Sequence, residues 1–287
     1  PNTIALVTSS SVFHWNIEND APTKVFERNP ALGEGSQIIN YQVSIDQKWC
    51  LLCGISAGAA AGTIVGNMQL YSIEKTVSQM LQGHCGVFTT IDNLPGRSAG
   101  DLAQVLCFEQ HKPDGTPPQL YIMEVGRAKD APGGVFRVAP QNIPVPADAG
   151  ADFPMVMTAS TKSGIVFMLS KTGYLYLFDI HSGKAIYRAR ITQDPVFCAT
   201  EHTASGGALA ITRRGQVLHM ALNEANLVPF IVSTLRDTAL AISLASRLNL
   251  PGADDLYTQQ FNQLLAANDL AGAAGVAASS PNGFLRT

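Results

Sequence analysis

The chain has 287 residues, of which 46% are hydrophobic and only 14% are charged. This composition excludes an intrinsically disordered chain, and no apolar run reaches the ~18 residues that a membrane-spanning helix needs. The net charge of -3, from 19 Lys and Arg against 22 Asp and Glu, excludes a strong overall attraction to nucleic acid or anionic lipid. We expect a globular protein of one large or two ordinary domains.

The first residues, PNTIALVTSS, include no initiator Met, no basic segment and no long apolar segment. They resemble neither a natural start nor a signal peptide, and they lead directly into a predicted strand. We therefore expect the chain to be a piece of a longer polypeptide. The five cysteines are an odd number scattered among Leu, Val and Phe, which indicates reduced thiols in a cytosolic protein.

A short strand-like unit, apolar on both faces, recurs roughly every 50 residues over residues 1–223. The copies are VFHWNIE (12–18), MQLYSIE (68–74), LYIMEVG (120–126), LYLFDIH (175–181) and VLHMALN (217–223). Each copy follows a second apolar run, so the repeating object is at least a β-hairpin.

The clearest copy spans residues 164–191 and predicts three strands joined by the turns KTG (171–173) and HSG (181–183). Its middle strand is apolar on both alternating faces, so its sheet must be covered on both sides. Repeated small antiparallel sheets that pack face to face are what a β-propeller requires. Residues 1–223 are therefore predicted to form propeller blades.

After residue 223 the apolar period becomes helical. Tyr257, Phe261, Leu264 and Leu265 form one stripe, and Leu240, Leu244 and Leu248 form another. Asp237 is predicted to cap one helix, and either Asn268 or Asp269 to cap the Ala-rich helix that follows. Short helices with one apolar face each normally stack, so residues 224–287 are predicted to begin an α-helical solenoid.

No convincing catalytic or metal site emerges, and no cofactor is predicted. Cys50 and Cys53 lack a second ligand pair and would point to opposite faces of a strand. The segment 58–66 is glycine-rich but lacks the Lys-Ser/Thr of a phosphate loop, so we expect a flexible loop there. For His84 and Cys85, a third group to orient the histidine cannot be assigned from the sequence.

The remaining histidines show no metal-ligand spacing; they are His14, His111, His181, His202 and His219. Glu124 and Asp179 lie near predicted strand ends, where carboxylates most often accept hydrogen bonds from turn backbone. We therefore expect no enzyme. A propeller offers grooves between blades in which an extended peptide can dock, so recognition is the predicted role.

Several short sequence segments carry information beyond the fold architecture. They are QIINY (37–41), QKW (47–49), MQLYS (68–72), VSQ (77–79), GH (83–84), RRGQVL (213–218) and the final LRT (285–287). In this order they resemble the clathrin heavy chain, over nearly the whole length. The resemblance implies a mainly β fold followed by α: about five blades of a seven-bladed propeller that run into a helical zigzag.

In that family the propeller binds short linear motifs of adaptor and accessory proteins through several grooves. The groove for clathrin-box peptides, between the first two blades, is expected to lie outside this chain. A second groove is implied at Trp49, Leu70, Lys75, Val77 and Gln79, where an apolar floor, one cation and one amide suit a Leu-rich peptide with an acidic residue. Lys75 stands where the family is expected to have arginine.

A third site, for tryptophan-containing motifs, is implied in part at Gln37, Ile39 and Ile55. For all these positions the alternative is structural: Trp49 and Leu70 as core residues and Lys75 as a solvated cation. The resemblance also implies no nucleic-acid partner, contact with membranes only through adaptors, and light-chain binding and trimerisation through regions outside this segment.

The predicted function is that of a coat protein in clathrin-mediated vesicle transport and endocytosis, on the cytosolic face of coated pits and vesicles. Two alternatives stay open. One is a propeller and solenoid scaffold of another vesicle coat or of the nuclear pore. The other is a propeller enzyme that uses the axial channel, which would need His and carboxylate residues converging there.

Overall fold

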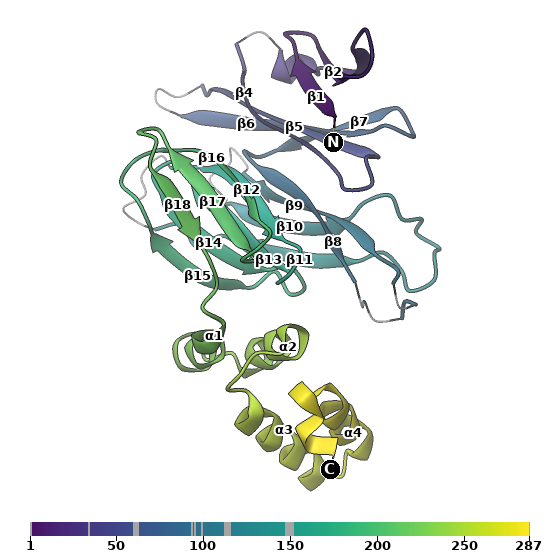
Figure 1. Cartoon of the computed structure of the whole chain (residues 1–287), viewed down its shortest axis with the longest axis vertical. Helices are drawn as coiled ribbons and strands as arrows, with labels where there is room; N and C mark the ends of the chain where they lie inside the picture. The colour runs from purple at the N-terminus through teal and green to yellow at the C-terminus, as the bar shows by residue number, and fades with distance from the viewer. Residues whose placement is uncertain are drawn as a thin grey trace. The chain divides into compact units, whose positions relative to one another are not determined.

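The computed structural model describes residues 2–33, 35–59, 63–92, 94, 96–98, 100–111, 116–146 and 152–286, without the side chains of 281 and 282. Two compact units divide the chain. One comprises Pro1–Thr203 and Ala208–His219, and the other comprises Ala204–Gly207 and Met220–Thr287. The first unit is built of strands and the second of helices (Figure 1).

Within the described residues the strands form five antiparallel sheets, each a meander in chain order. The first contains β1 (Thr3–Val7), β2 (Ser11–Asn16) and β3 (Thr23–Glu27), and is followed by the short 3-10 helix Pro30–Leu32. The second contains β4 (Gln37–Val43), β5 (Trp49–Ala57), β6 (Ile64–Ser72) and β7 (Val77–Gln82). The third contains β8 (Gly86–Ile91), β9 (Ala103–Gln110), β10 (Gln119–Glu124) and β11 (Arg137–Asn142).

The fourth sheet contains β12 (Pro154–Ser160), β13 (Ile165–Ser170), β14 (Tyr174–Asp179) and β15 (Ala185–Arg190), and the fifth contains β16 (Val196–His202), β17 (Gly207–Thr212) and β18 (Val217–Met220). The first strands of the later four sheets adjoin one another: β8 contacts β4 and β12, and β12 contacts β16. This is the arrangement of propeller blades around an axis. The predicted fold class, propeller blades followed by helices, is confirmed.

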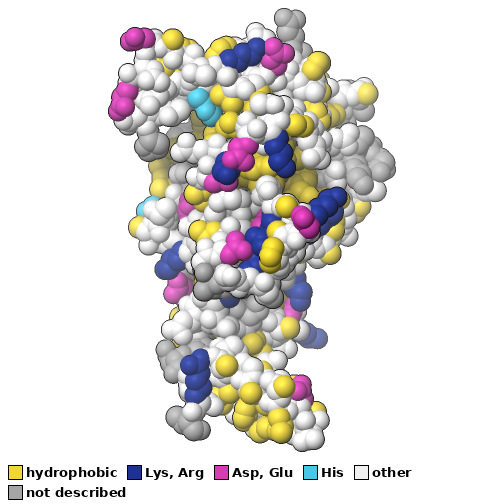
Figure 2. All heavy atoms as spheres, turned by 90° about the vertical axis from the view of Figure 1, so that its right-hand side faces the viewer, with side chains coloured by type: hydrophobic (Ala, Val, Ile, Leu, Met, Phe, Trp, Pro, Cys, Tyr) yellow, Lys and Arg dark blue, Asp and Glu magenta, His cyan; other side chains and the backbone are white. Residues whose placement is uncertain are grey.

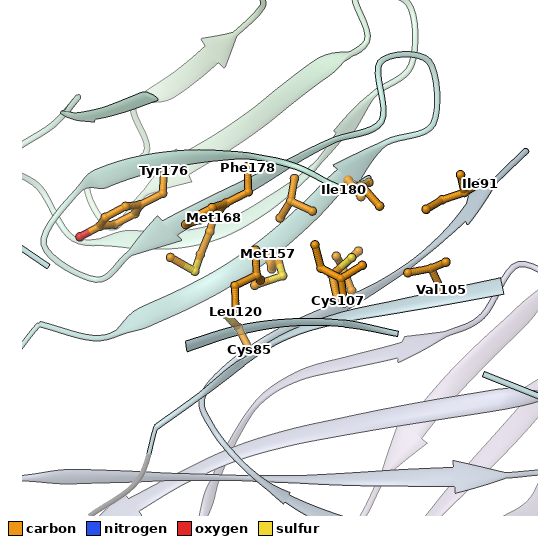
Figure 3. Close-up of a cluster of buried hydrophobic side chains, with 14 of the residues drawn as sticks. Cys85, Ile91, Val105, Cys107, Leu120, Met157, Met168, Tyr176, Phe178 and Ile180 are labelled. Carbon is orange, nitrogen blue, oxygen red and sulfur yellow. The ribbon is translucent and has the colours of Figure 1, made fainter. Parts of the chain in front are cut away.

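Apolar burial on both sides holds these sheets together. All six residues of β14 are buried. Tyr176 and Phe178 belong to one buried cluster with residues of the preceding sheet, including Val105 and Cys107 of β9 (Figure 3). Leu175 and Leu177, on the opposite face of the strand, are also buried. The predicted two-sided cover is therefore present, and the predicted turns hold Gly173 and Gly183 at positive φ.

The glycine-rich segment 58–66 differs in part from the predicted loop. Residues 60–62 lie outside the described residues, but Ile64, Val65 and Gly66 belong to strand β6. Gly66 is fixed by a close approach, since a Cβ there would meet the carbonyl oxygen of Gly83 at 2.3 Å. Any larger residue would push these two backbone segments apart, which explains why glycine stands in a strand.

The second unit contains α1 (Glu224–Phe230), a π-helical segment (Ile231–Leu235), α2 (Thr238–Leu248), α3 (Asp254–Ala266), α4 (Leu270–Ser279) and the 3-10 helix Pro281–Arg286. Asp237 caps α2 by accepting a hydrogen bond from the N–H of Leu240 at 3.0 Å. Asp269, and not Asn268, caps α4 through the N–H of Gly272 at 2.9 Å. In the part of the chain that the structure describes, each helix is too short or too polar to cross a bilayer.

The apolar stripes of the helices are only partly buried. Leu240 and Leu244 of α2 are buried, as is Tyr257 of α3, whose hydroxyl donates to the carbonyl oxygen of Ile242 at 3.1 Å. Leu265, which the periodicity places in the same stripe as Tyr257, is 42% exposed. It stands near the end of α3.

A buried ion pair joins the loop between β8 and β9 to the end of strand β10. Arg97 reaches Glu124 at the end of β10 through two hydrogen bonds of 2.8 and 2.5 Å, and the two side chains are 1% and 3% exposed. Glu124 also accepts the N–H of Phe136 at 2.8 Å. The prediction that Glu124 serves turn backbone was thus incomplete, because its main partner is a guanidinium 27 residues away. Asp179 matches the prediction: it accepts the N–H and the hydroxyl of Ser182.

Replacing Phe178 with Ala removes a side chain that lies fully within the core, and we expect the free energy of unfolding to fall by about 3–5 kcal/mol. Phe197→Ala is the matched control, because Phe197 is 70% exposed, and its effect should stay within about 0.5 kcal/mol. Urea denaturation followed by circular dichroism measures both. Equal effects of the two substitutions would contradict the assigned core.

The Arg97–Glu124 pair predicts a dependence of stability on pH. Burial raises the pKa of Glu124, but the hydrogen bonds from Arg97 and Phe136 outweigh it and hold the pKa below the ordinary 4.5. A lowered pKa stabilises the fold above the ordinary value, and this contribution is lost as the pH falls below 4.5 through the lowered pKa. Glu124→Gln should cost about 3–5 kcal/mol at pH 7, and its difference from the parent should shrink below pH 4.5.

Denaturation of the parent and of Glu124→Gln at several pH values measures this difference. Glu27→Gln is the control, because Glu27 pairs with Lys24 at the exposed surface, where such pairs contribute little. A difference between the parent and Glu124→Gln that is the same at pH 7 and pH 3.5 would show that the charge of Glu124 does not matter.

Candidate peptide-binding site

Four of the predicted peptide-binding residues share one face of the second sheet. In its antiparallel register Trp49 lies opposite Ser72, and Leu70 lies opposite Gln79. Val77 also lies opposite Ser72. Residues directly opposite each other project to the same side of a sheet, and so do alternate residues along a strand. Trp49, Leu70, Val77 and Gln79 therefore point the same way, and we call their shared surface the Trp49 face.

This face is buried at its centre and exposed at its edge. Leu70 is only 6% exposed and packs with Leu51, Phe88 and Phe108 in a core shared with the third sheet. Val77 is 59% exposed, and Gln79 is also exposed. Leu70 is therefore a core residue that supports the face from below, while Val77 and Gln79 are accessible to a partner.

Trp49 lies at the margin between the two sheets. Its side chain is half-buried and packs beside that shared core. A Cβ built on Gly126, which follows β10, would lie 3.3 Å from the indole Nε1. Gly126 also has a φ of 88°, a conformation that favours glycine. The backbone of Gly126 therefore lies against the indole, and no side chain at position 126 competes with the ring for this space.

Lys75 contributes an unpaired cation beside this face. It lies in the turn between β6 and β7, where its N–H donates to the Ser72 hydroxyl at 3.3 Å and its side chain is exposed. The neighbouring Glu74 is engaged by Lys48 at 2.6 Å. Among the described residues no carboxylate pairs with the Lys75 ammonium. The sequence reasoning missed Lys48, which pairs with Glu74.

Charge on the molecular surface is mixed. Figure 2 shows Lys and Arg side chains next to Asp and Glu side chains over the strand unit, with hydrophobic side chains exposed between them. A surface of this kind offers no broad field of one sign. Recognition of an acidic ligand would therefore depend on a local cation such as Lys75.

The third predicted set lies at the other end of the same sheet. Gln37 of β4 lies opposite Ile55 of β5, and Ile39 falls within a bulge between Ile38 and Asn40. Gln37 is exposed, whereas Ile39 and Ile55 are half-buried. Ile55 is on the same face as Trp49 but six positions further along β5, which is roughly 20 Å at the usual rise of a strand. The two predicted sets are therefore separate surfaces.

The cysteines show the packing role that the sequence predicts. Cys50 and Cys53 project into different core clusters, on opposite sides of β5. Burial raises the pKa of the Cys53 thiol to about 12, which disfavours the reactive thiolate. Within the described ranges no group of three or more His, Cys, Asp or Glu residues is arranged to hold a metal ion. Cys198 differs from the other four cysteines in being exposed.

His84 has an orienting partner that sequence reasoning did not identify. Its ring Nδ1 lies 3.1 Å from Oε2 of Glu109, which also accepts the backbone N–H of His84 at 2.8 Å. The third group, which the sequence alone did not assign, is therefore Glu109. The available signal was Glu109 itself, an acidic residue that directly follows the apolar run 105–108 of β9. Burial is the main cause that raises the pKa of the adjacent Cys85 thiol, so Cys85 is no candidate nucleophile.

Comparison with known families places three matches on the chain. Residues 33–74, which include β4 to β6, match the clathrin propeller repeat. Residues 224–247 match the clathrin heavy-chain linker, and residues 249–287 match the family described as Clathrin-H-link. The matches thus cover part of the strand unit and nearly all of the helical unit.

Curated relatives extend the similarity to the whole chain. A probable clathrin heavy chain 1 of Caenorhabditis elegans is 42% identical over 286 residues, covering 99% of this chain and 16% of that protein. The clathrin heavy chain of Drosophila melanogaster is 40% identical over 289 residues, covering 100% of this chain and 17% of that protein. The chain spans about one sixth of the length of these relatives. The resemblance on which the peptide-binding residues were predicted is confirmed.

Among solved structures, the β-propeller domain of Cps50 (Swd1) from Myceliophteria thermophila matches with a TM-score of 0.44 and 9% identity, covering 76% of this chain and 66% of that chain. This likeness adds nothing to the sequence matches.

Proposed function

We propose, from the premise that the chain belongs to the clathrin heavy chain family, that it forms part of a clathrin coat and that its Trp49 face binds short linear motifs of adaptor proteins. The supporting observation is the placement of Trp49, Val77 and Gln79 on one face, with the unpaired Lys75 in the turn beside them. The coat role rests on the relatives, and the binding role rests on this placement.

The chemistry of the face suits an extended, leucine-rich peptide with an acidic residue. The exposed Val77 and the half-buried Trp49 offer apolar contact, and Gln79 offers an amide that both donates and accepts hydrogen bonds. Strand β7 is the last strand of its sheet and, among the described residues, has a ladder partner on one side only. An extended peptide could therefore also hydrogen-bond along its backbone, as in other cases of strand addition.

Lys75 determines what kind of charge contact the face can make with an acidic peptide. An ammonium is a compact point charge on a flexible stem, without the planar fork by which arginine holds a carboxylate through two parallel hydrogen bonds. Binding through Lys75 should be weak and tolerant of the exact position of the acidic residue. Weak binding fits a coat, because many copies of a weak site presented on one lattice act together by avidity.

The setting of this activity follows from the family. We place the chain on the cytosolic face of coated pits and coated vesicles during vesicle transport and endocytosis, with membranes contacted only through adaptors. Light-chain binding and trimerisation are assigned to regions outside this segment. The half-buried Ile39 and Ile55, together with Gln37, are proposed as a second, separate peptide site for tryptophan-containing motifs.

Gln79→Ala and Lys75→Ala should each weaken binding of a peptide that carries two leucines and one aspartate, by roughly tenfold, because each removes a hydrogen bond or a charge contact. The measurement is fluorescence anisotropy of the labelled peptide with the full chain.

Gln82→Ala is the control, since Gln82 is an exposed residue of the same type on the same strand, and its position opposite Asn67 places it on the other face. The proposed role of the Trp49 face is wrong if Gln79→Ala and Gln82→Ala have the same effect. Replacing the peptide's aspartate with asparagine should abolish the difference between Lys75→Ala and the parent.

A further inference from the structure

A cavity of about 380 Å³ opens within the strand unit, away from the Trp49 face. Its walls come from residues in and around the third and fourth sheets and from the start of β6, and they include Ile64, Phe153, Met168 and Tyr176. Figure 3 shows Met168 and Tyr176 at one end of the cluster of buried side chains. The volume is at the lower end of the range for ligand pockets, about 300–1,000 Å³.

Buried hydrogen-bond acceptors line this cavity without partners. Glu109 is 0% exposed and His84 is 2% exposed. Oε2 of Glu109 is occupied by His84, but Oε1 of Glu109 and Nε2 of His84 have no hydrogen-bond partner among the described residues. Oδ2 of Asp152 likewise has no hydrogen-bond partner among the described residues, while its Oδ1 accepts the N–H of Thr172 at 2.9 Å. Unsatisfied buried polar atoms are costly, and three at one cavity call for a ligand.

Two of these atoms are hydrogen-bond acceptors. A carboxylate can only accept hydrogen bonds, so Glu109 Oε1 and Asp152 Oδ2 both require a donor. The walls therefore offer two carboxylate oxygens to whatever occupies the cavity.

The nearby basic side chains that the structure describes leave these acceptors without a hydrogen bond. His111 Nδ1 lies 3.9 Å from Glu109 Oε1, beyond hydrogen-bonding distance, and its side chain is 46% exposed. The Lys171 ammonium lies over the ring of Phe153, 5.3 Å from its centre. A metal ion is not the expected occupant, because the described residues include no cluster of three or more metal-ligating groups.

We propose that this cavity binds an organic cation with a short apolar stem, either an alkylammonium or an alkylguanidinium group. The cationic head donates to Glu109 Oε1 and Asp152 Oδ2, and the stem packs against Phe153 and Met168. Such a group occurs in a Lys or Arg side chain of a partner peptide and in a free amine. The site shares no residue with the Trp49 face and goes beyond the function proposed above.

Isothermal titration calorimetry of the full chain with butylguanidinium tests the site, with the neutral butylurea as the matched probe. Butylguanidinium should bind saturably and butylurea at least roughly tenfold more weakly, because only the former makes charge-assisted hydrogen bonds. Glu109→Gln and Asp152→Asn should each reduce the affinity for butylguanidinium by roughly tenfold. Glu18→Gln, which changes an exposed carboxylate, should leave it unchanged.

Circular dichroism shows whether each variant is folded, and if Glu109→Gln is not, Asp152→Asn decides. Equal binding of butylurea and butylguanidinium, unchanged affinity in a folded variant, or no saturable binding would each overturn the proposal. Titration with the acetylated amide Leu-Arg-Leu identifies the source of the cation: tighter binding than butylguanidinium indicates a peptide side chain, and weaker binding indicates a free amine. Gln79→Ala should not affect either titration, so this site and the Trp49 face can fail independently.

Discussion

The middle sheets of the strand unit depend on neighbours that cover both of their faces. The six residues of β14 are all buried, and the side chains on either side of a sheet can leave water only by packing on an adjacent sheet. The clusters around Phe178, around Leu70 and around Leu52 each bring together residues of two sheets. Such a sheet is therefore not stable on its own, because its side chains are buried only when another sheet packs next to it. The Trp49 face exists because this cover ends at the sheet margin, where Val77 and Gln79 reach solvent.

Much of this fold follows from patterns that are local in sequence. The apolar alternation and the glycine turns of residues 164–191 predicted the β13–β15 meander, and the aspartates before α2 and α4 predicted helix caps. Strands such as β7 (VSQMLQ) and β11 (RVAPQN) carry many polar residues and are largely exposed, so no apolar period marks them. They form because a buried neighbour provides a ladder of hydrogen bonds. Local pattern also could not choose between Asn268 and Asp269, since either can accept the capping hydrogen bond.

The candidate sites likewise contain some features that the sequence predicts and others that it does not. That Trp49, Leu70 and Gln79 share a face depends on strand alternation and on the register between neighbouring strands, both of which short turns set within a hairpin. The pairs His84–Glu109 and Arg97–Glu124 join residues 25 and 27 positions apart. Their partners are fixed by how strands and loops fold back on one another, and the sequence alone does not pair them. The acceptor-lined cavity depends in addition on Asp152 and Phe153 from another sheet, so only the assembled blades reveal it.

The solvated ammonium of Lys75 has a kinetic consequence. At physiological ionic strength, dissolved ions screen an exposed charge over about 8 Å, so under the proposed function this group would guide an acidic segment only in the final approach and would not retain it for long. Residence on a single copy would then be brief. A lattice built from such copies would exchange its cargo-bound ligands continually while keeping their number constant, and it would release them together when the copies disperse.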